Sequence, residues 1–341
     1  MSSVFGRLLN QARSIGSKGD EASLASDPST FFPQGIKTLV NPLVPAVDIV
    51  FVHGLTGDRE RTWTSPKNSI LWPRDLLPNR IQQARILTFG YDAYVIQRNS
   101  PVSTNRIRNH AKDLIYSLAC YRKETRTESL PIIFVAHGLG GLVCKAAILI
   151  SDSCLDDHLQ SISICAIAVA FLGTPHHDSV LANWAKIPAK SLGVLKQANV
   201  DILSVLETNS EILSRLQDDF LALLHRWSRL GLFEVTCFYE TLPMPKVGVI
   251  VPSDSAILAG YNHISLHADH RGVARFDSIR DPGFLSITLE LERWISHAFR
   301  SDAYSSGNYA KTLTTGAQWS QQAVQPKPKG RGPDWSTMAW L

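Results

Sequence analysis

The stretch Pro131–Ile150, PIIFVAHGLGGLVCKAAILI, decides the fold that we expect for this chain. It opens with a short apolar run rich in β-branched residues, Ile132–Val135, which is typical of a buried strand. Ala136-His137-Gly138-Leu139-Gly140 follows, and the apolar segment Leu142–Leu149 begins directly after it. The small residues at both ends of this turn allow a strand and a helix to approach closely. The stretch therefore predicts a buried strand, a very tight turn and a buried helix.

This layout matches the nucleophile elbow, small-x-Ser-x-Gly, whose central serine takes a strained backbone conformation with its side chain above the sheet. The central residue here is Gly138, which has no side chain. The sequence therefore predicts the frame of a serine hydrolase without the attacking oxygen.

The composition limits the class of protein. Of the 341 residues, 44% are hydrophobic and 19% are charged, which is enough to bury a substantial core. The 34 basic and 30 acidic residues nearly balance, so the charge does not predict nucleic-acid binding. Five cysteines without CxxC spacing indicate a reducing, cytoplasmic compartment and neither a metal nor another cofactor. The longest apolar run, Ile162–Leu172, is shorter than the roughly 20 residues of a transmembrane helix.

Strand-like and helix-like segments alternate along the chain, which predicts an α/β protein with a mostly parallel, doubly wound sheet. The expected strands are Ala46–Val52, Ala84–Phe89, Ile132–Val135, Ser163–Leu172, Phe233–Tyr239 and Val247–Val251. Helical periodicity marks Arg106–Arg122, Leu142–Leu149 and Asp281–Arg300, after a short helix at Trp72–Leu77. We expect one domain over residues 36–300 between a flexible tail, 1–35, and a disordered tail, 301–341. Within it, the helical segment 181–232 is either a cap over the site or a set of packing helices.

His53-Gly54 directly follows the first of these strands. A strand that ends in His-Gly upstream of an elbow is where hydrolases of this kind place the oxyanion loop, because glycine lets a backbone N–H face the substrate oxygen. The donors would be the backbone N–H groups of Leu55 and Leu139.

The acid and the base of a hydrolase triad follow the nucleophile along the chain in the order acid, then histidine. Glu240 ends a late strand and His270 lies in the final loop, so they are the predicted pair. Asp254 is the rival acid, and His263 and His267 are the rival bases.

Other polar residues lie beside these positions. Tyr91-Asp92 follows a strand and is expected to line or support the site. The predicted substrate-binding residues are His53, Gly54, Tyr91, Asp92 and His137. His137 is expected to pack and to form hydrogen bonds, not to act as the base. His176-His177 is expected to be a polar loop at the mouth of the site, because no acidic cluster or ligand spacing indicates a metal.

Seven blocks in order resemble the serine-esterase-like α/β-hydrolase domains of filamentous fungi, which are related to lipase-like serine-active-site proteins of mitochondria and endoplasmic reticulum. The resemblance covers about Ile36–Ser296, and its blocks are Val47–Thr64, Trp72–Pro78, Ala84–Val95, Pro131–Ala147, Phe171–Ser179, Cys237–Tyr261 and His267–Phe276. It implies an α/β-hydrolase fold with the nucleophile at position 138, the acid at Glu240 and the base at His270.

The resemblance also bears on partners and location. In fungi such domains often form the N-terminal part of larger STAND or NLR-like proteins linked to self/non-self recognition, which implies a protein partner of that type. Mitochondrial or endoplasmic-reticulum association is the alternative location, and the basic, acid-free residues 1–18 fit a mitochondrial transit peptide.

Two functions follow from glycine at position 138. The first is a non-catalytic regulatory or signalling module that binds an acyl ester, a lipid-like ligand or a protein partner, because glycine fits the backbone of the elbow without strain. The alternative is an active hydrolase of carboxylic esters or lipids. In that case Gly138 is an altered serine, or another serine such as Ser179 or Ser255 supplies the nucleophile.

Overall fold

The computed structural model describes residues 34–54, 57–91, 104–177, 210–228, 231 and 233–305. The two predicted tails lie outside the described residues, apart from the stretches that border the domain. Most of the predicted cap also lies outside them, and only its last helix, α7 (Ser210–Ser228), is described.

Seven strands form one sheet in the order β1-β3-β2-β4-β5-β6-β7. Their bounds are β1 Gly35–Val40, β2 Val47–Val52, β3 Ala84–Gly90, β4 Ile132–His137, β5 Ala166–Leu172, β6 Glu234–Glu240 and β7 Asn262–Leu266. Only β1 is antiparallel, where it pairs with β3 at the edge. Strand β1 was not predicted, because its sequence, GIKTLV, has no long apolar run.

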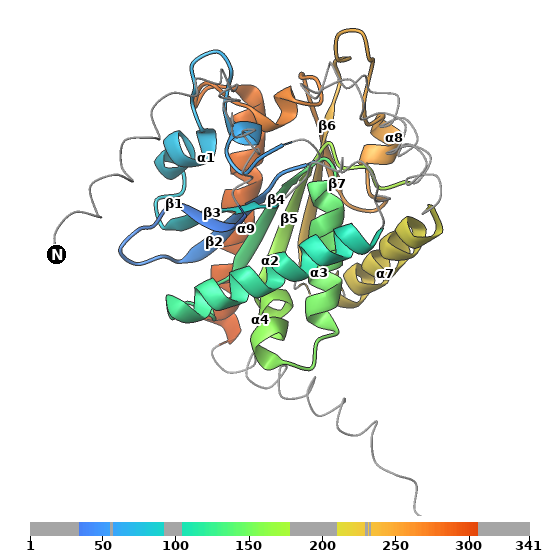
Figure 1. Ribbon diagram of the computed structural model, residues 1–341. Helices are drawn as coiled ribbons and strands as arrows, with labels where there is room; N and C mark the ends of the chain where they lie inside the picture. The colour runs from blue at the N-terminus through green and yellow to red at the C-terminus, as the bar shows by residue number, and fades with distance from the viewer. Residues whose placement is uncertain are drawn as a thin grey trace, which may run out of the picture. The chain divides into compact units, whose positions relative to one another are not determined.

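The helices of the described residues lie on both faces of the sheet (Figure 1). Their bounds are α1 Trp72–Asp75, α2 Thr104–Glu124, α3 Gly140–Asp152, α4 Asp157–Cys165, α7 Ser210–Ser228, α8 Ser253–Ala256 and α9 Pro282–Ser305. Helices α2, α3, α4 and α7 cover one face, and α1 and α9 cover the other. This is the α/β-hydrolase fold with the mostly parallel, doubly wound sheet that the sequence predicts.

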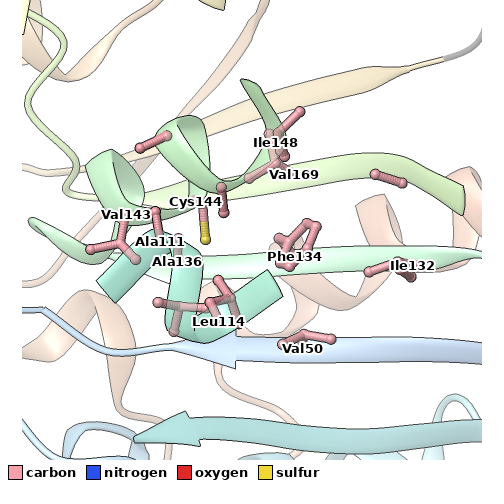
Figure 2. Packing of buried hydrophobic residues seen from close by; sticks show 14 of the residues in the cluster. Val50, Ala111, Leu114, Ile132, Phe134, Ala136, Val143, Cys144, Ile148 and Val169 are labelled. Carbon is pink, nitrogen blue, oxygen red and sulfur yellow. The ribbon is translucent and has the colours of Figure 1, made fainter. Parts of the chain in front are cut away.

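The strands carry apolar side chains on both faces because both faces are covered by helices. In β4, Phe134 and Ala136 pack toward α2 and α3, as Figure 2 shows, while Ile133 and Val135 belong to the core on the α9 side. Every residue of β2 and β3 is buried. This alternation divides the interior into two apolar layers with the sheet between them.

Two predicted strands are wrong in part or entirely. Ser163–Cys165 are the last turn of α4, a helix that begins where the Asp156 side chain accepts a hydrogen bond from the His158 N–H at 2.9 Å. Val247–Val251 forms a turn, because the Ile250 and Val251 N–H groups donate to Glu240 Oε1 and not to a neighbouring strand. Both errors arose because an apolar run was taken to indicate a strand, whereas one run belongs in part to a helix and the other to a turn.

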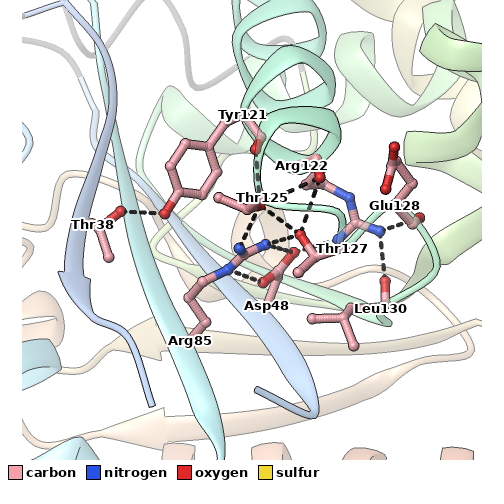
Figure 3. A network of polar contacts seen from close by, with 9 residues as sticks. All are labelled: Thr38, Asp48, Arg85, Tyr121, Arg122, Thr125, Thr127, Glu128 and Leu130. Carbon is pink, nitrogen blue, oxygen red and sulfur yellow. Dashed lines mark hydrogen bonds and ion pairs between the residues drawn. The ribbon is translucent and has the colours of Figure 1, made fainter. Parts of the chain in front are cut away.

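A buried ion-pair cluster joins β2, β3 and α2 at the amino end of the sheet (Figure 3). Asp48 accepts two hydrogen bonds from the Arg85 guanidinium, at 2.6 and 2.8 Å, and a further one from Arg122. Arg122 also donates to the carbonyl oxygens of Glu128 and Leu130, at 2.6 and 2.7 Å. None of the three charged side chains is more than 1% exposed. The cluster therefore ties the C-terminal end of α2 to the first residues of two central strands.

No helix in the described residues combines the length and the hydrophobicity that crossing a membrane would require.

Candidate active site

Gly138 lies at the turn between β4 and α3 and has a φ of +53°. This left-handed conformation is rare for residues with a Cβ atom, and glycine takes it at little cost. The Gly138 N–H donates to the Leu172 carbonyl of β5 at 2.9 Å, and its own carbonyl accepts from the Gly141 N–H at 3.1 Å. The turn thus has the strand–turn–helix geometry of the predicted elbow, with no side chain at its centre.

The loop that follows β2 packs directly on this elbow. A Cβ atom on Gly140 would lie 2.3 Å from the His53 carbonyl oxygen. A Cβ atom on Gly54 would lie 2.8 Å from the His137 carbonyl oxygen and 3.4 Å from the Leu139 nitrogen. Only glycine fits either position, and the predicted oxyanion loop therefore lies against the Leu139 N–H. The second predicted donor, Leu55, lies outside the described residues.

Glu240 and His270 are brought together at the carboxyl end of the sheet. Glu240 is the last residue of β6, and its Oε2 lies 2.6 Å from His270 Nδ1. Its Oε1 accepts from the backbone N–H groups of Ile250 and Val251 at 2.6 and 3.2 Å. Both side chains of the pair are buried. In this arrangement a proton on Nδ1 donates to the Glu240 carboxyl group, which leaves Nε2 as the ring nitrogen that can accept a proton.

Gly173 packs directly against this pair. Sequence reasoning did not single it out. It follows β5 with a φ of +55°, and its N–H donates to the Phe238 carbonyl at 2.7 Å. A Cβ atom here would lie 3.0 Å from His270 Nδ1 and 3.6 Å from Glu240 Oε2. The only signal in the sequence was its position directly after an apolar strand, within the block Phe171–Ser179.

The rival acid and bases lie elsewhere in the described residues. Asp254 is in the short helix α8, where its Oδ1 accepts from the Ser255 N–H at 2.9 Å. His263 and His267 are exposed. Glu240 has its contact with His270, as the order of residues along the chain predicted.

His53 and Tyr91 form a buried stack beside the oxyanion loop. Their ring centroids lie 4.3 Å apart, and the Tyr91 hydroxyl donates to the His53 carbonyl at 2.6 Å. Burial lowers the pKa of His53 to about 4, so the imidazole is neutral at physiological pH. Tyr91 thus supports the loop, its substrate-binding role stays a prediction, and Asp92 lies outside the described residues.

His137 packs against the residue predicted to be the base. Its Nε2 lies 2.8 Å from the His270 carbonyl oxygen, and the two ring centroids are 4.7 Å apart. Burial, followed by the neighbouring His270, lowers the pKa of His137 to about 3. A neutral ring with a proton on Nε2 therefore donates to the main chain of the His270 loop, in keeping with the packing and hydrogen-bonding role expected.

Ser255 and His176 both lie in the interior of the protein. Ser255 is buried, with its hydroxyl 3.5 Å from the His177 carbonyl oxygen, and Ser179 lies outside the described residues. His176 is buried and not part of an exposed polar loop, which corrects the prediction, because its ring contacts Lys145 and Cys237 in the interior. No group of three or more His, Cys, Asp or Glu in the described part of the chain is arranged to hold a metal ion.

Comparisons with known sequences give distant relatives. No family model matches the chain. Protein SERAC1 of Danio rerio is 27% identical over 252 residues, which cover 67% of this chain and 36% of that protein. Protein SERAC1 of Bos taurus is 26% identical over 250 residues with the same coverage. The chain thus aligns with little more than a third of the length of these curated relatives.

Among solved structures, esterase B of Lactobacillus rhamnosis superposes with a TM-score of 0.46 and 14% identity, over 79% of this chain and 81% of that one. The NocB thioesterase domain from the nocardicin cluster superposes with a TM-score of 0.41 and 14% identity, over 75% of this chain and 99% of that one. The 2-hydroxy-6-oxo-6-phenylhexa-2,4-dienoate hydrolase of Rhodococcus sp. strain RHA1 superposes with a TM-score of 0.42 and 13% identity, over 78% of this chain and 97% of that one.

Proposed function

We propose that this chain is an esterase-like hydrolase domain that binds an acyl ester or a lipid-like ligand without cleaving it, in a regulatory or signalling role. The observation that carries the proposal is the glycine at the elbow. Gly138 has a φ of +53° in the turn predicted to carry a nucleophile, and Glu240 and His270 lie in contact at the carboxyl end of the same sheet. Without an attacking oxygen, the pair has no hydroxyl from which to take a proton.

The preserved parts of the site support ligand binding. The loop at Gly54 lies against the Leu139 N–H, which in hydrolases of this fold faces the carbonyl oxygen of an ester. Donors of this kind still bind a substrate when the nucleophile is missing. In serine proteases the loss of the triad leaves roughly 10³–10⁴-fold acceleration over water from binding and the oxyanion hole alone. A partner protein of the STAND or NLR type rests on the sequence resemblance alone and has no support from the relatives above.

The test restores the missing group. The full chain and its Gly138→Ser variant are incubated with a fluorophosphonate probe, which labels activated serines, and with p-nitrophenyl butyrate and octanoate. We expect no labelling of the unmodified chain. Gly138→Ser should be labelled and should hydrolyse the esters at least about 10²-fold faster, since removing a nucleophilic serine costs up to about 10⁶ in turnover. Because φ is positive at 138, circular dichroism should first establish that the variant folds.

Matched variants identify the residues responsible. In the Gly138→Ser background, Glu240→Gln and His270→Asn should each abolish most labelling, whereas Asp254→Asn and His263→Gln should leave it intact. Labelling of the unmodified chain that disappears in Ser179→Ala or Ser255→Ala would contradict the proposal and establish the alternative, an active hydrolase with another nucleophile. A folded Gly138→Ser variant without any gain would show that the triad has been misplaced. For ligand binding, the unmodified chain should be stabilised against heat by p-nitrophenyl octanoate without releasing p-nitrophenol.

A further inference from the structure

Lys145 lies in the interior of the protein behind the elbow. It belongs to α3, about two helical turns beyond Gly138, and is fully buried. Its Nζ lies 2.7 Å from His176 Nδ1 and forms a hydrogen bond with Gln217 Oε1 of α7. The rings of Phe171 and Phe220 lie 5.5 and 5.8 Å from the same nitrogen. A buried lysine is thus the meeting point of the elbow helix and α7.

The contacts of Lys145 continue into the sheet. His176 follows β5, and its Nε2 lies 3.5 Å from Cys237 Sγ on β6. The amide nitrogen of Gln217 is buried without a hydrogen-bond partner among the described residues. Gln217 therefore holds α7 to the buried cluster through its carbonyl oxygen, whereas another polar contact between the two helices, the Arg226–Asp152 pair at 2.6 Å, lies at the more exposed end of α3.

No carboxylate in the described part of the chain forms an ion pair with Lys145, although buried charges are ordinarily paired. The titratable groups that face it are His176 and Cys237, with His177 next to His176. Burial lowers the pKa of Lys145 to about 7 and also keeps the pKa of His176 well below its usual value. Burial raises the pKa of the Cys237 thiol to about 11. Above neutral pH the cluster is therefore uncharged.

In the neutral cluster every polar atom except the Gln217 amide nitrogen has a hydrogen-bond partner. A neutral Lys145 amine donates to Gln217 Oε1 and to His176 Nδ1, and His176 then carries its proton on Nε2, facing the Cys237 sulfur. A proton added to Lys145 creates an ammonium ion with no neutralising carboxylate, and the two aromatic rings offset only part of its lost hydration. The charged form gains most by reaching water.

We propose that Lys145, His176 and Gln217 form a proton-controlled latch between α3 and α7, closed while Lys145 is neutral and opened when it takes up a proton. The Lys145–Gln217 bond spans the two helices, so separation of α7 from α3 is the movement that hydrates the ammonium. Because α3 begins at the elbow, the latch links pH to the packing behind the candidate site. This inference does not depend on whether the site binds an acyl ligand.

Hydrogen–deuterium exchange of the full chain between pH 6 and pH 8.5, corrected for the intrinsic exchange rate, tests the latch. Peptides from α7 should lose about 30-fold in protection between pH 8.5 and pH 6, because the hydrated amine of the open form, with its ordinary pKa of 10.5, binds more protons than the buried amine at every pH above about 7, which favours opening about tenfold per pH unit down to that value. Lys145→Met should remove this dependence. Lys112→Met, which replaces an exposed lysine of α2, should keep it.

Two further variants cover the other outcomes. Gln217→Leu removes the acceptor on α7, so its α7 protection at pH 8.5 should already be as low as that of the unmodified chain at pH 6. This variant also serves if Lys145→Met does not fold. His176→Gln should keep the pH dependence. Protection that is flat across the range in the unmodified chain, unchanged in Gln217→Leu, or flat only in His176→Gln would overturn the proposal.

Discussion

The two ends of the sheet bury polar groups in different ways. At the amino end, Asp48 lies between the guanidinium groups of Arg85 and Arg122, and the charges neutralise one another within a closed cluster. At the carboxyl end, Glu240 and His270 are paired, but His53 and His137 around them are kept uncharged by burial. The amino end is thus built from paired ions, and the carboxyl end depends on neutral rings and on glycines that let them approach.

The difference separates a structural cluster from a candidate site. The amino-end charges contact strand residues and the end of α2, and their burial leaves no place for a ligand. The carboxyl-end groups converge on an elbow whose neighbouring positions, Gly54 and Gly140, tolerate no side chain. Polar groups gathered at the carboxyl ends of parallel strands are the usual location of ligand sites in open α/β sheets. The comparison predicts different responses to mutation and to pH.

The largest effect is expected at the amino end. Asp48→Asn leaves two buried guanidinium groups without a carboxylate, and breaking a buried ion pair in this way costs about 3–5 kcal/mol. Urea denaturation should report that loss in the free energy of unfolding. The control is Asp152→Asn, because Asp152 pairs with the largely exposed Arg226 and should cost less than about 1 kcal/mol. Equal effects of the two substitutions would mean that the cluster is not the structural element inferred here.

The carboxyl end should instead respond to pH. The folded-state pKa of His53, about 4, lies below its unfolded value of 6.5, so the unfolded state binds more protons between these values. The stabilisation is complete above pH 6.5 and is lost as the pH falls toward 4, and it amounts to about 3 kcal/mol. His53→Gln should reduce the slope of unfolding free energy against pH in that window by up to about one proton, while the slope due to the buried His137 and His176 remains.

The control for this prediction is His263→Gln, which removes an exposed histidine and not a buried one. A pH slope that is the same in His53→Gln as in the unmodified chain would contradict the assignment of a buried, neutral imidazole to position 53.

The smallest expected change in unfolding free energy concerns the contact between Gly173 and His270, the candidate base. Gly173 and Gly231 have similar φ values, +55° and +65°, so alanine at either position should cost about 1–2 kcal/mol in backbone strain. At Gly173 the new Cβ atom meets the His270 ring, whereas at Gly231 it meets no atom of the described residues within 4 Å. Gly173→Ala should therefore cost about 1 kcal/mol more than Gly231→Ala in urea denaturation. Equal costs would mean that the imidazole moves aside freely.

Much of this organisation could be predicted from local patterns. The apolar runs of β2, β3, β4 and β6 and the periodicity of α2 and α9 identified their elements, because a strand buried on both faces and an amphipathic helix each leave a regular trace. The order of Gly138, Glu240 and His270 along the chain indicated which acid would meet which histidine, and the structure places that pair 2.6 Å apart. Their catalytic or binding roles stay predictions.

Other features of the fold and the interior could not be predicted from the residues next to them in the sequence. The polar edge strand β1 was missed, and the apolar stretch Val247–Val251 was taken for a strand although its amides donate to Glu240. Gly173 and Lys145 were not singled out, since a glycine after a strand and a lysine in a helix have many ordinary explanations.

The sequence by itself determined the alternation of strands and helices, the tight turn at position 138 and the absence of a hydroxyl there, because each depends on residues adjacent in the chain. Only the tertiary structure decided which polar groups meet in the interior: Asp48 with two arginines, Glu240 with His270 over Gly173, and Lys145 with His176 and Gln217. These contacts join segments far apart in sequence, and the balance between desolvation and pairing that sets their charge exists only once the sheet and helices have closed around them.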